Sequence, residues 1–187
     1  IKTDELSRKN AQMLNEKSGV QLRHFETVSE HDGGQSYPDY LAETLVLPSE
    51  KYDTDTVFGV REGLRRGFQN FLLIGVIGQR LDHSLGNLSI LLMLHENGCK
   101  GKIVDDYSEM ELVGQEPVFV EDRFSSFSLI NLSGIAKGIS IENAKYCYLP
   151  GHEICCDYQY GISNEVLPGK TARITVEEGN LLLIKNR

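Results

Sequence analysis

Several sequence features that mark large classes of protein are absent from this chain of 187 residues. No apolar run approaches the roughly 18 residues that a membrane-spanning helix needs, and the first residues lack the charged-then-apolar pattern of a signal peptide. We therefore expect neither membrane insertion nor export. Positive charge is also scarce: Lys and Arg number 19 against 27 Asp and Glu, a formal net charge of −8. Such an acidic chain is not expected to bind nucleic acid or an anionic membrane.

The chain has four cysteines, and their spacing does not suit a metal site. Cys155 and Cys156 are adjacent, which makes them an awkward pair of ligands for one tetrahedral zinc. We expect reduced, packed thiols in a cytoplasmic protein. A hydrophobic content of 40% is enough for a buried core, and the length allows one large domain or two small ones.

Residues 1–113 predict a parallel α/β domain. Alternating strands and helices form βαβ units, whose parallel sheets carry helices on their faces. The run 71–74 is apolar without a polar break, as in a strand buried on both faces. Residues 4–18 predict a surface helix, and 30–40 predict a loop. The other elements expected are strands at 44–47, 71–76 and 102–104, and helices at 54–66 and 82–96 that Gly67 and Gly98 would end.

Residues 114–187 predict a small antiparallel β-sandwich domain. Short strand-like runs are separated here by turn dipeptides such as Pro-Gly, Ser-Gly and Glu-Gly. No helical stretch of comparable quality appears in this half of the sequence. The runs lie at 117–120, 126–130, 172–176 and 181–184.

The most informative segment is the turn that joins the strand at 71–76 to the helix after it. Residues 75–83 are Gly-Val-Ile-Gly-Gln-Arg-Leu-Asp-His. Backbone N–H groups at a glycine-bearing turn, a helix N-terminus and the guanidinium of Arg80 together make a place for phosphate oxygens. An ordinary connection, with Arg80 on the surface and Asp82 as the helix N-cap, explains the same residues. Spacing alone does not decide between these two interpretations.

Two further segments carry recognisable patterns. Residues 48–55 are Pro-Ser-Glu-Lys-Tyr-Asp-Thr-Asp, and Gly-Ile-Ser-Asn-Glu at 161–165 leads to a Glu-Glu-Gly-Asn turn and a last apolar run. Together with 75–83, they resemble, in the same order, the motifs of the thiamine pyrophosphokinases. Those motifs are Pro-x-Glu-Lys-Asp-x-Thr-Asp, Gly-x-x-Gly-x-Arg-Leu-Asp-His and a C-terminal Ser-Asn-Glu element. The resemblance covers roughly residues 45–187.

The resemblance implies transfer of a diphosphoryl group from ATP to thiamine, which yields thiamine diphosphate and AMP. It implies Mg²⁺ as cofactor, an α/β domain that binds ATP and a β-sandwich that binds thiamine. This architecture agrees with the pattern of strands and helices. The family resemblance also implies a homodimer, with thiamine sites between subunits.

The resemblance also assigns residues to the ATP half of the site. Asp55 would be a magnesium ligand, although it or Thr54 can equally cap the helix that starts there. Asp82 could hold Arg80 in place, contact magnesium or accept the thiamine hydroxyl proton, and all three roles stay open. His83, in the first turn of a helix, suits a structural role better than that of a general base. The catalytic set is Asp55, Arg80 and Asp82, and the ATP-binding set is Lys51, Thr54, Gly78, Arg80 and Asn87.

In the β domain the resemblance assigns three residues to thiamine. Ser163 and Asn164 would contact the pyrimidine, to which an amide offers both a donor and an acceptor. Turn formation is the alternative role for this pair. Tyr146 would stack on the substrate, and the alternative is a tyrosine packed in the core.

The sequence departs from the family in three places. The Asp-Gly-Gly and Gly-Asp-x-Asp-Ser elements, which precede the other motifs in the family, are not recognisable, and Asp32-Gly33-Gly34 lies too close to 48–55 and in the wrong order. We therefore expect that the numbering begins inside the protein. Gln79 replaces a common glycine, and 30–40 looks like an insertion. Other candidate functions are a catalytically impaired thiamine- or nucleotide-binding protein, a pyrophosphokinase for a different acceptor, and a structural protein.

Overall fold

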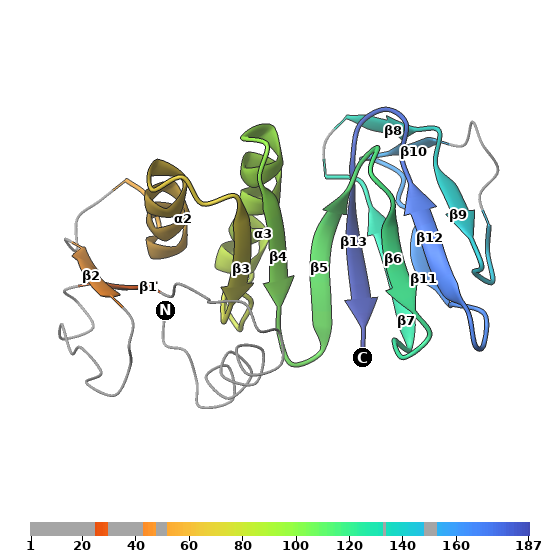
Figure 1. Cartoon of the computed structure of the whole chain (residues 1–187), viewed down its shortest axis with the longest axis horizontal. Coiled ribbons are helices and arrows are strands. Elements are labelled where there is room, and N and C mark those ends of the chain that lie inside the picture. Colours follow the sequence, from red (N-terminus) through yellow and green to blue (C-terminus); the bar gives the residue numbers. More distant parts are fainter. Residues whose placement is uncertain (1–24, 30–42, 48–51, 133, 148–152) are drawn as a thin grey trace. The chain divides into compact units, whose positions relative to one another are not determined.

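The computed structural model describes residues 25–29, 43–47, 52–132, 134–147 and 153–187 (Figure 1). The predicted elements at 4–18 and 30–40, and Lys51, lie outside these ranges. The chain forms two compact units, Ile1–Lys100 and Gly101–Arg187, and each is described by itself. The division falls before β5 (Ser108–Val113), a strand that the predicted boundary at 113 places with the α/β domain.

The first unit alternates strands and helices. Strands β1 (Phe25–Ser29) and β2 (Glu43–Leu47) pair in parallel, with Phe25 opposite Glu43 and Ser29 opposite Leu47. Helix α2 (Asp55–Arg65), strand β3 (Asn70–Ile74) and helix α3 (Leu81–Glu96) follow. The strands predicted at 44–47 and 71–76 and the helices predicted at 54–66 and 82–96 are confirmed, each within a few residues.

Local signals set the ends of both helices. Thr54 caps α2, because the N–H of Val57 donates to its Oγ1 at 3.3 Å. Thr54, and not Asp55, is therefore the N-cap. After α2 and α3 the chain turns at Gly67 and Gly98, which have φ of +80° and +68°, a backbone conformation that suits glycine.

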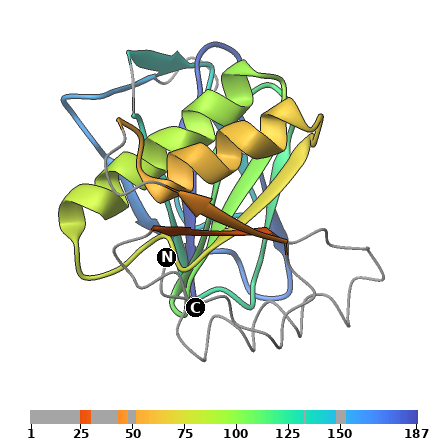
Figure 2. The same cartoon turned by 90° about the vertical axis from the view of Figure 1, so that its left-hand side faces the viewer.

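Helices α2 and α3 lie side by side and run in the same direction, so both begin on the same side of the first unit (Figure 2). Val60 of α2 packs with Ile90 and Leu94 of α3, and all three side chains are buried. The expected burial of the strand at 71–74 on both faces is wrong, because no residue of β3 is buried and Leu72 is 36% exposed. An apolar run shows which residues tolerate burial, not how many elements cover them.

The second unit is built from antiparallel strand pairs. One sheet contains β11, β7, β13, β5 and β4 in that order, a second contains β6, β12 and β9, and β10 pairs with β8 (Figure 1). The remaining bounds are β4 (Lys100–Val104), β6 (Val118–Glu121), β7 (Ser126–Ile130), β8 (Ile135–Lys137), β9 (Ser140–Glu142), β10 (Glu153–Cys155), β11 (Gly161–Asn164), β12 (Thr171–Thr175) and β13 (Leu181–Asn186). The antiparallel character predicted for 114–187 is confirmed.

One strand pairing was not predicted. The strand predicted at 102–104 is confirmed as β4, and its Lys102 lies opposite Glu111 of β5 in an antiparallel hairpin. Its turn is closed by Asp105, whose carboxylate accepts hydrogen bonds from the N–H groups of Tyr107 and Ser108 at 2.8 and 2.6 Å. This short aspartate turn is the local reason for the hairpin.

Buried side chains from the two larger sheets form one core. Phe127, Leu129 and Leu183 come from one sheet, and Val120 and Ile174 come from the other, all at most 1% exposed. Burying such side chains supplies the main stabilising free energy of a β unit of this size.

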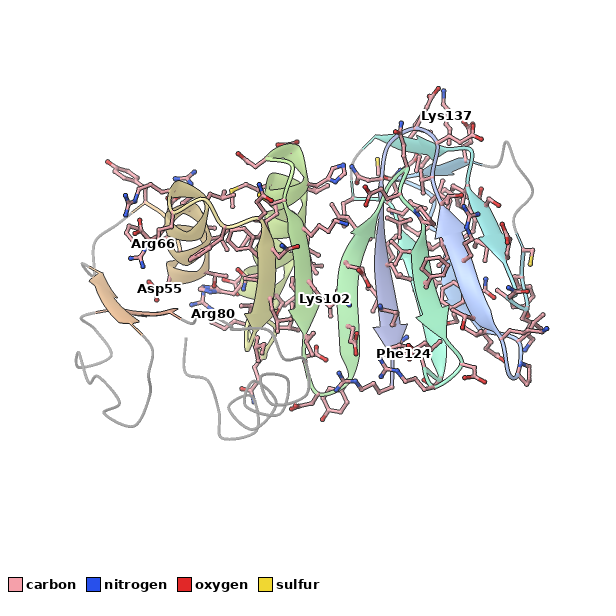
Figure 3. All side chains as sticks on the ribbon, viewed as in Figure 1. Asp55, Arg66, Arg80, Lys102, Phe124 and Lys137 are labelled. Carbon is pink, nitrogen blue, oxygen red and sulfur yellow. The ribbon has the colours of Figure 1, made fainter. Side chains whose placement is uncertain are left out.

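Charged side chains from the neighbouring strands β4, β5 and β13 form a cluster in this unit. The side chain of Lys185 is only 5% exposed, and its Nζ lies 2.5 Å from an oxygen of Glu111 and 3.9 Å from one of Glu109. Lys102 and Phe124, labelled in Figure 3, belong to the same cluster: Lys102 pairs with both glutamates, and Phe124 lies under the Lys185 ammonium, 5.5 Å from its ring centroid.

The charges in this cluster perturb Glu109. Burial alone would raise the pKa of Glu109. The hydrogen bond from Arg187 and the charges of Lys102, Lys185 and Arg123 lower this pKa by more than burial raises it, so the net shift is downward.

All four cysteines are free thiols, as expected. Their expected packing is wrong for Cys147 and Cys156, which are exposed. Cys147 directly follows the exposed Tyr146 and is exposed with it. Cysteine is usually a buried residue type, but its type alone does not decide whether it is buried. No helix within the described ranges is long and apolar enough to cross a membrane.

Candidate functional site

Two buried polar side chains of α3 shape the turn between β3 and α3. The Nδ2 of Asn87 donates to the carbonyl of Val76 at 2.6 Å. The N–H of Gly78 donates to Oγ of Ser84 at 3.1 Å, and that hydroxyl in turn lies 3.1 Å from the carbonyls of Gly78 and Arg80. Both side chains are buried. Side chains of α3 therefore hold the backbone of this turn in place without any ligand.

These bonds place two predicted ATP-binding residues in supporting positions. The N–H of Gly78, expected to face phosphate, is directed at Ser84, and the amide of Asn87 is directed at the turn. Direct contact of either residue with ATP stays a prediction. Ser84 is missed by the sequence analysis, although its position three residues before Asn87 on α3 puts both on one helix face.

Arg80 is the N-cap residue of α3 and forms a two-bond ion pair with Asp82. Its Nη2 lies 2.6 Å from one oxygen of Asp82, and its Nε lies 3.3 Å from the other. The interpretation of Asp82 as N-cap is wrong, because Asp82 lies inside the first turn. Of the three roles left open for Asp82, holding Arg80 is the one that this geometry displays.

The Arg80–Asp82 pair faces solvent. Its side chains are 70% and 65% exposed, so an anion can reach the guanidinium. The hydrogen bond between them raises the pKa of Arg80 and lowers that of Asp82, which keeps both groups charged near neutral pH. His83, the next residue, is exposed in the same turn.

The second part of the predicted ATP site is at the start of α2. Asp55 is the first residue of the helix and is half-buried, while the preceding Asp53 pairs with Arg61. Figure 3 labels Asp55 and Arg80, which begin α2 and precede α3, two helices whose N-termini lie on the same side (Figure 2). Helix N-termini attract anions, so this side of the unit suits phosphate.

We compared these residues with the demands of a magnesium ion. Within the described ranges, no group of three or more His, Cys, Asp or Glu side chains could hold a metal. Mg²⁺ usually keeps several waters and binds through one or two carboxylates together with substrate phosphates. A single carboxylate at Asp55 fits that mode, and a cage built from protein ligands alone does not.

In the second unit the three predicted thiamine residues come together. Asn164 is 5% exposed, and its Oδ1 accepts hydrogen bonds from the N–H groups of Tyr146 at 3.0 Å and Glu165 at 2.9 Å. Its Nδ2 donates to the carbonyl of Tyr146 at 2.7 Å. The Tyr146 side chain is 58% exposed, so the alternative that it packs in the core is wrong.

The backbone beside Asn164 is irregular. Ser163 has a left-handed φ of +61°, and the register of β11 against β7 shifts between Gly161 and Asn164. The N–H of Ser163 donates to Oγ of the buried Ser128 at 3.1 Å. This bulge leaves the Ser163 side chain exposed and turns Asn164 inward.

An ion pair lies beside the Tyr146 ring. Nζ of Lys145 lies 3.1 Å from a carboxylate oxygen of Glu165 and 5.8 Å from the ring centroid. The hydrogen bond to Glu165 raises the pKa of Lys145. The ring therefore already has a cation near it, an arrangement that aromatic faces favour.

No protein-family model matches this sequence, and no curated protein matches it. Solved structures do match its fold. The thiamin pyrophosphokinase of Geobacillus thermodenitrificans is 23% identical, with a TM-score of 0.66 over 95% of this chain and 83% of that one. A thiamin pyrophosphokinase family protein of Enterococcus faecalis is 20% identical, with a TM-score of 0.68 over 94% and 84%. The thiamine pyrophosphokinase of Bacillus subtilis is 22% identical, with a TM-score of 0.68 over 76% and 67%. The chain thus has the fold of these proteins.

Proposed function

We propose that this protein is a thiamine pyrophosphokinase, a transferase that converts thiamine and ATP to thiamine diphosphate and AMP. The observation that carries the proposal is the shared fold over 95% of the chain. The motif residues at the turn before α3 and around Asn164 support it independently, because each group is gathered by hydrogen bonds into one place.

In the proposed reaction the hydroxyl oxygen of thiamine attacks the β-phosphorus of ATP. The bond from that phosphorus to the oxygen bridging it to the α-phosphate breaks, AMP leaves with that oxygen, and the hydroxyl proton passes to a base. Arg80 would bind phosphate oxygens with the N–H groups of its guanidinium that do not face Asp82, and would neutralise charge that develops on them. Asp82 orients the guanidinium and is also a candidate for the base.

The start of α2 would serve the same phosphates. Thr54 fixes the helix end, Asp55 would hold Mg²⁺, and Lys51 would meet a phosphate as a point charge. When bound, the ion would neutralise phosphate charge during transfer. Gly78 and Asn87 would keep the turn in the shape that presents Arg80.

In the second unit, Tyr146 would stack on thiamine and Ser163 would contact its pyrimidine ring. Tyr146 is exposed, and its backbone N–H and carbonyl are hydrogen-bonded to the side chain of Asn164. A cationic thiazolium or a flat pyrimidine suits such an aromatic face.

The direct test is product analysis with the purified chain. Thiamine, ATP and Mg²⁺ should yield equal amounts of thiamine diphosphate and AMP, measured by chromatography and ³¹P NMR. ADP with thiamine monophosphate would refute diphosphoryl transfer. Binding of both ligands in calorimetry without turnover would instead identify a catalytically impaired binding protein. If neither ligand binds, the structural protein is the candidate function that remains.

We also propose a homodimer in which two subunits contribute to each thiamine site. Mixing an Asp55→Ala chain with a Tyr146→Ala chain should then restore part of the activity, because some heterodimers carry one intact site. No recovery after verified subunit exchange, or a monomer by sedimentation, would refute a shared site.

A further inference from the structure

The side-chain amide of Asn164 is almost fully used by the protein itself. Its Oδ1 accepts two hydrogen bonds, from the N–H groups of Tyr146 and Glu165, and its Nδ2 donates to the carbonyl of Tyr146. An amide oxygen accepts two bonds, so no acceptor is left for a ligand. The side chain is also 5% exposed. A pyrimidine could therefore donate to this amide only by breaking a bond that is already made, and the one group left for it is the second N–H of Nδ2, on a residue with little exposed surface.

The two bonds to Tyr146 close a ring between the amide and one residue's backbone. Donor and acceptor of the Asn164 side chain pair with the carbonyl and the N–H of the same residue, 18 positions earlier in the chain. This replaces the pairing that a neighbouring strand would give. Ala144 forms an isolated bridge with Val166, and the N–H of Lys145 donates to the carbonyl of Glu165 at 2.9 Å, so the amide continues this short ladder by one residue.

The bulge in β11 explains how the side chain reaches that position. In a regular strand, Ser163 and Asn164 would point to opposite faces and lie level with the partner strand. The left-handed backbone of Ser163, held by the bond from its N–H to Ser128, shifts the register at this place. A non-glycine residue in this conformation is disfavoured, so the surrounding contacts must maintain it.

We propose that Asn164 is a positioning residue: it fixes the backbone of Tyr146, and thereby the aromatic ring, and does not itself contact the ligand. This inference rests on the proposed function, in which Tyr146 receives thiamine. It differs from the role predicted from sequence, where Asn164 binds the pyrimidine directly. The two roles predict different coupling between Asn164 and Tyr146.

The same unit contains a matched control. Gln159 forms the same two-bond ring with another residue: its Oε1 accepts from the N–H of Asn131 at 2.9 Å, and its Nε2 donates to the carbonyl of Asn131 at 2.8 Å. Nε2 of Gln159 also donates to the carbonyl of Cys156 at 3.1 Å, so Gln159→Ala removes three hydrogen bonds, as Asn164→Ala does, from a residue with no assigned place in the thiamine site. It reports the loss of stability that any such deletion causes.

The experiment is a double-mutant cycle on the full chain, with thiamine as the probe. Asn164→Ala should raise the thiamine KM about threefold to tenfold, the range expected for a misplaced aromatic contact, and leave the ATP KM unchanged. In a Tyr146→Ala background, Asn164→Ala should have no further effect on the thiamine KM. Gln159→Ala should leave both constants unchanged. Additive effects of Asn164→Ala and Tyr146→Ala would overturn the proposal and restore direct contact.

Amide hydrogen exchange tests, without any ligand, whether the side chain of Asn164 holds the backbone of Tyr146 in place. The N–H of Tyr146 should be protected in the wild type and in Gln159→Ala, and should lose protection in Asn164→Leu and Asn164→Ala, because neither variant keeps the oxygen that accepts its hydrogen bond. Asn164→Leu provides a second variant if the alanine variant does not fold, because leucine has nearly the shape of asparagine and carries neither donor nor acceptor. Unchanged exchange overturns the proposal. If the wild type fails to bind thiamine, the proposed function is refuted, and with it the role of Asn164 in ligand binding. Hydrogen exchange then still decides whether the Asn164 amide holds the backbone of Tyr146.

Discussion

The Ser84 hydroxyl offers a sharp test of whether the turn before α3 serves catalysis. Ser84→Ala removes one accepted and one donated hydrogen bond, each 3.1 Å long, and leaves the bond from Asn87 to Val76 in place. At about 1 kcal/mol net for each hydrogen bond, the free energy of unfolding should fall by about 2 kcal/mol. For a chain of this length, that lowers Tm by about 4–8 °C.

The same change should reach Arg80, because Ser84 also faces the carbonyl of Arg80. A shift of about 1 Å in a positioned group can reduce a rate by up to about 10²-fold. We therefore expect kcat/KM for ATP to fall by about 10- to 100-fold in Ser84→Ala, with the KM for thiamine unchanged. Steady-state kinetics and calorimetric Tm measure the two effects separately.

Ser89→Ala is the matched control on the same helix. Ser89 is exposed and donates to the carbonyl of Gly86 at 2.6 Å, away from the turn. Its loss should change Tm and kinetics little, as for most surface substitutions. If Ser84→Ala lowers Tm but leaves the ATP kinetics at the wild-type level, the turn does not present Arg80 to ATP. If Tm does not change either, the two hydrogen bonds give no net stability.

Three more predictions concern charge. Asp55→Ala and Arg80→Ala should each lower turnover by about 10²-fold or more without unfolding the chain, and activity within a few-fold of wild type would remove that residue from the site. Lys185→Met should destabilise the second unit by about 2–4 kcal/mol in denaturant titrations because Glu111 loses its buried partner, whereas Lys185→Met with Glu111→Leu should recover most of it. Because the pKa of Glu109 is lowered in the folded state, its contribution to stability is complete above its ordinary pKa of 4.5 and is lost as pH falls through the lower folded value. Glu109→Gln should therefore make Tm decline less steeply below about pH 4.5. If the decline is the same as in the wild type, other groups cause it.

The elements that the sequence predicts well are those with local signals. A capping threonine before α2 and a glycine after each helix fix the ends of both helices within a few residues. Strands β7 and β13 are apolar enough to stand out. Each of these signals acts over a few neighbouring residues, so one sequence is sufficient to detect it.

Strand β5 shows why other elements were missed. Glu109 and Glu111 alternate with Met110, which looks like a strand with one solvent-facing side, or no strand at all. Both carboxylates instead face Lys102 and Lys185 within the protein. Their partners lie on different strands, and only the folded register brings them together. Sequence spacing does not contain that pairing.

The same limit applies to roles within the candidate site. The family resemblance assigns Gly78, Asn87 and Asn164 to ligands, and their chemical groups suit phosphate or pyrimidine. In the structure these groups bond to the protein's own side chains and backbone. A sequence shows which donors and acceptors are available, and geometry decides which of them the fold has already used.

Each unit, taken separately, uses the same arrangement around one exposed candidate group. Arg80 is carried by a turn that Ser84 supports from α3, and Tyr146 is carried by a segment that Asn164 supports from β11. The group that faces solvent is long or aromatic, and the group that holds it is small, polar and buried. A ligand then meets a side chain whose backbone is already ordered, so less conformational freedom is lost on binding. It follows that substitutions of the buried supports should weaken binding without removing any atom that touches the ligand. The supports and the groups they hold should therefore be coupled in double-mutant cycles within each unit.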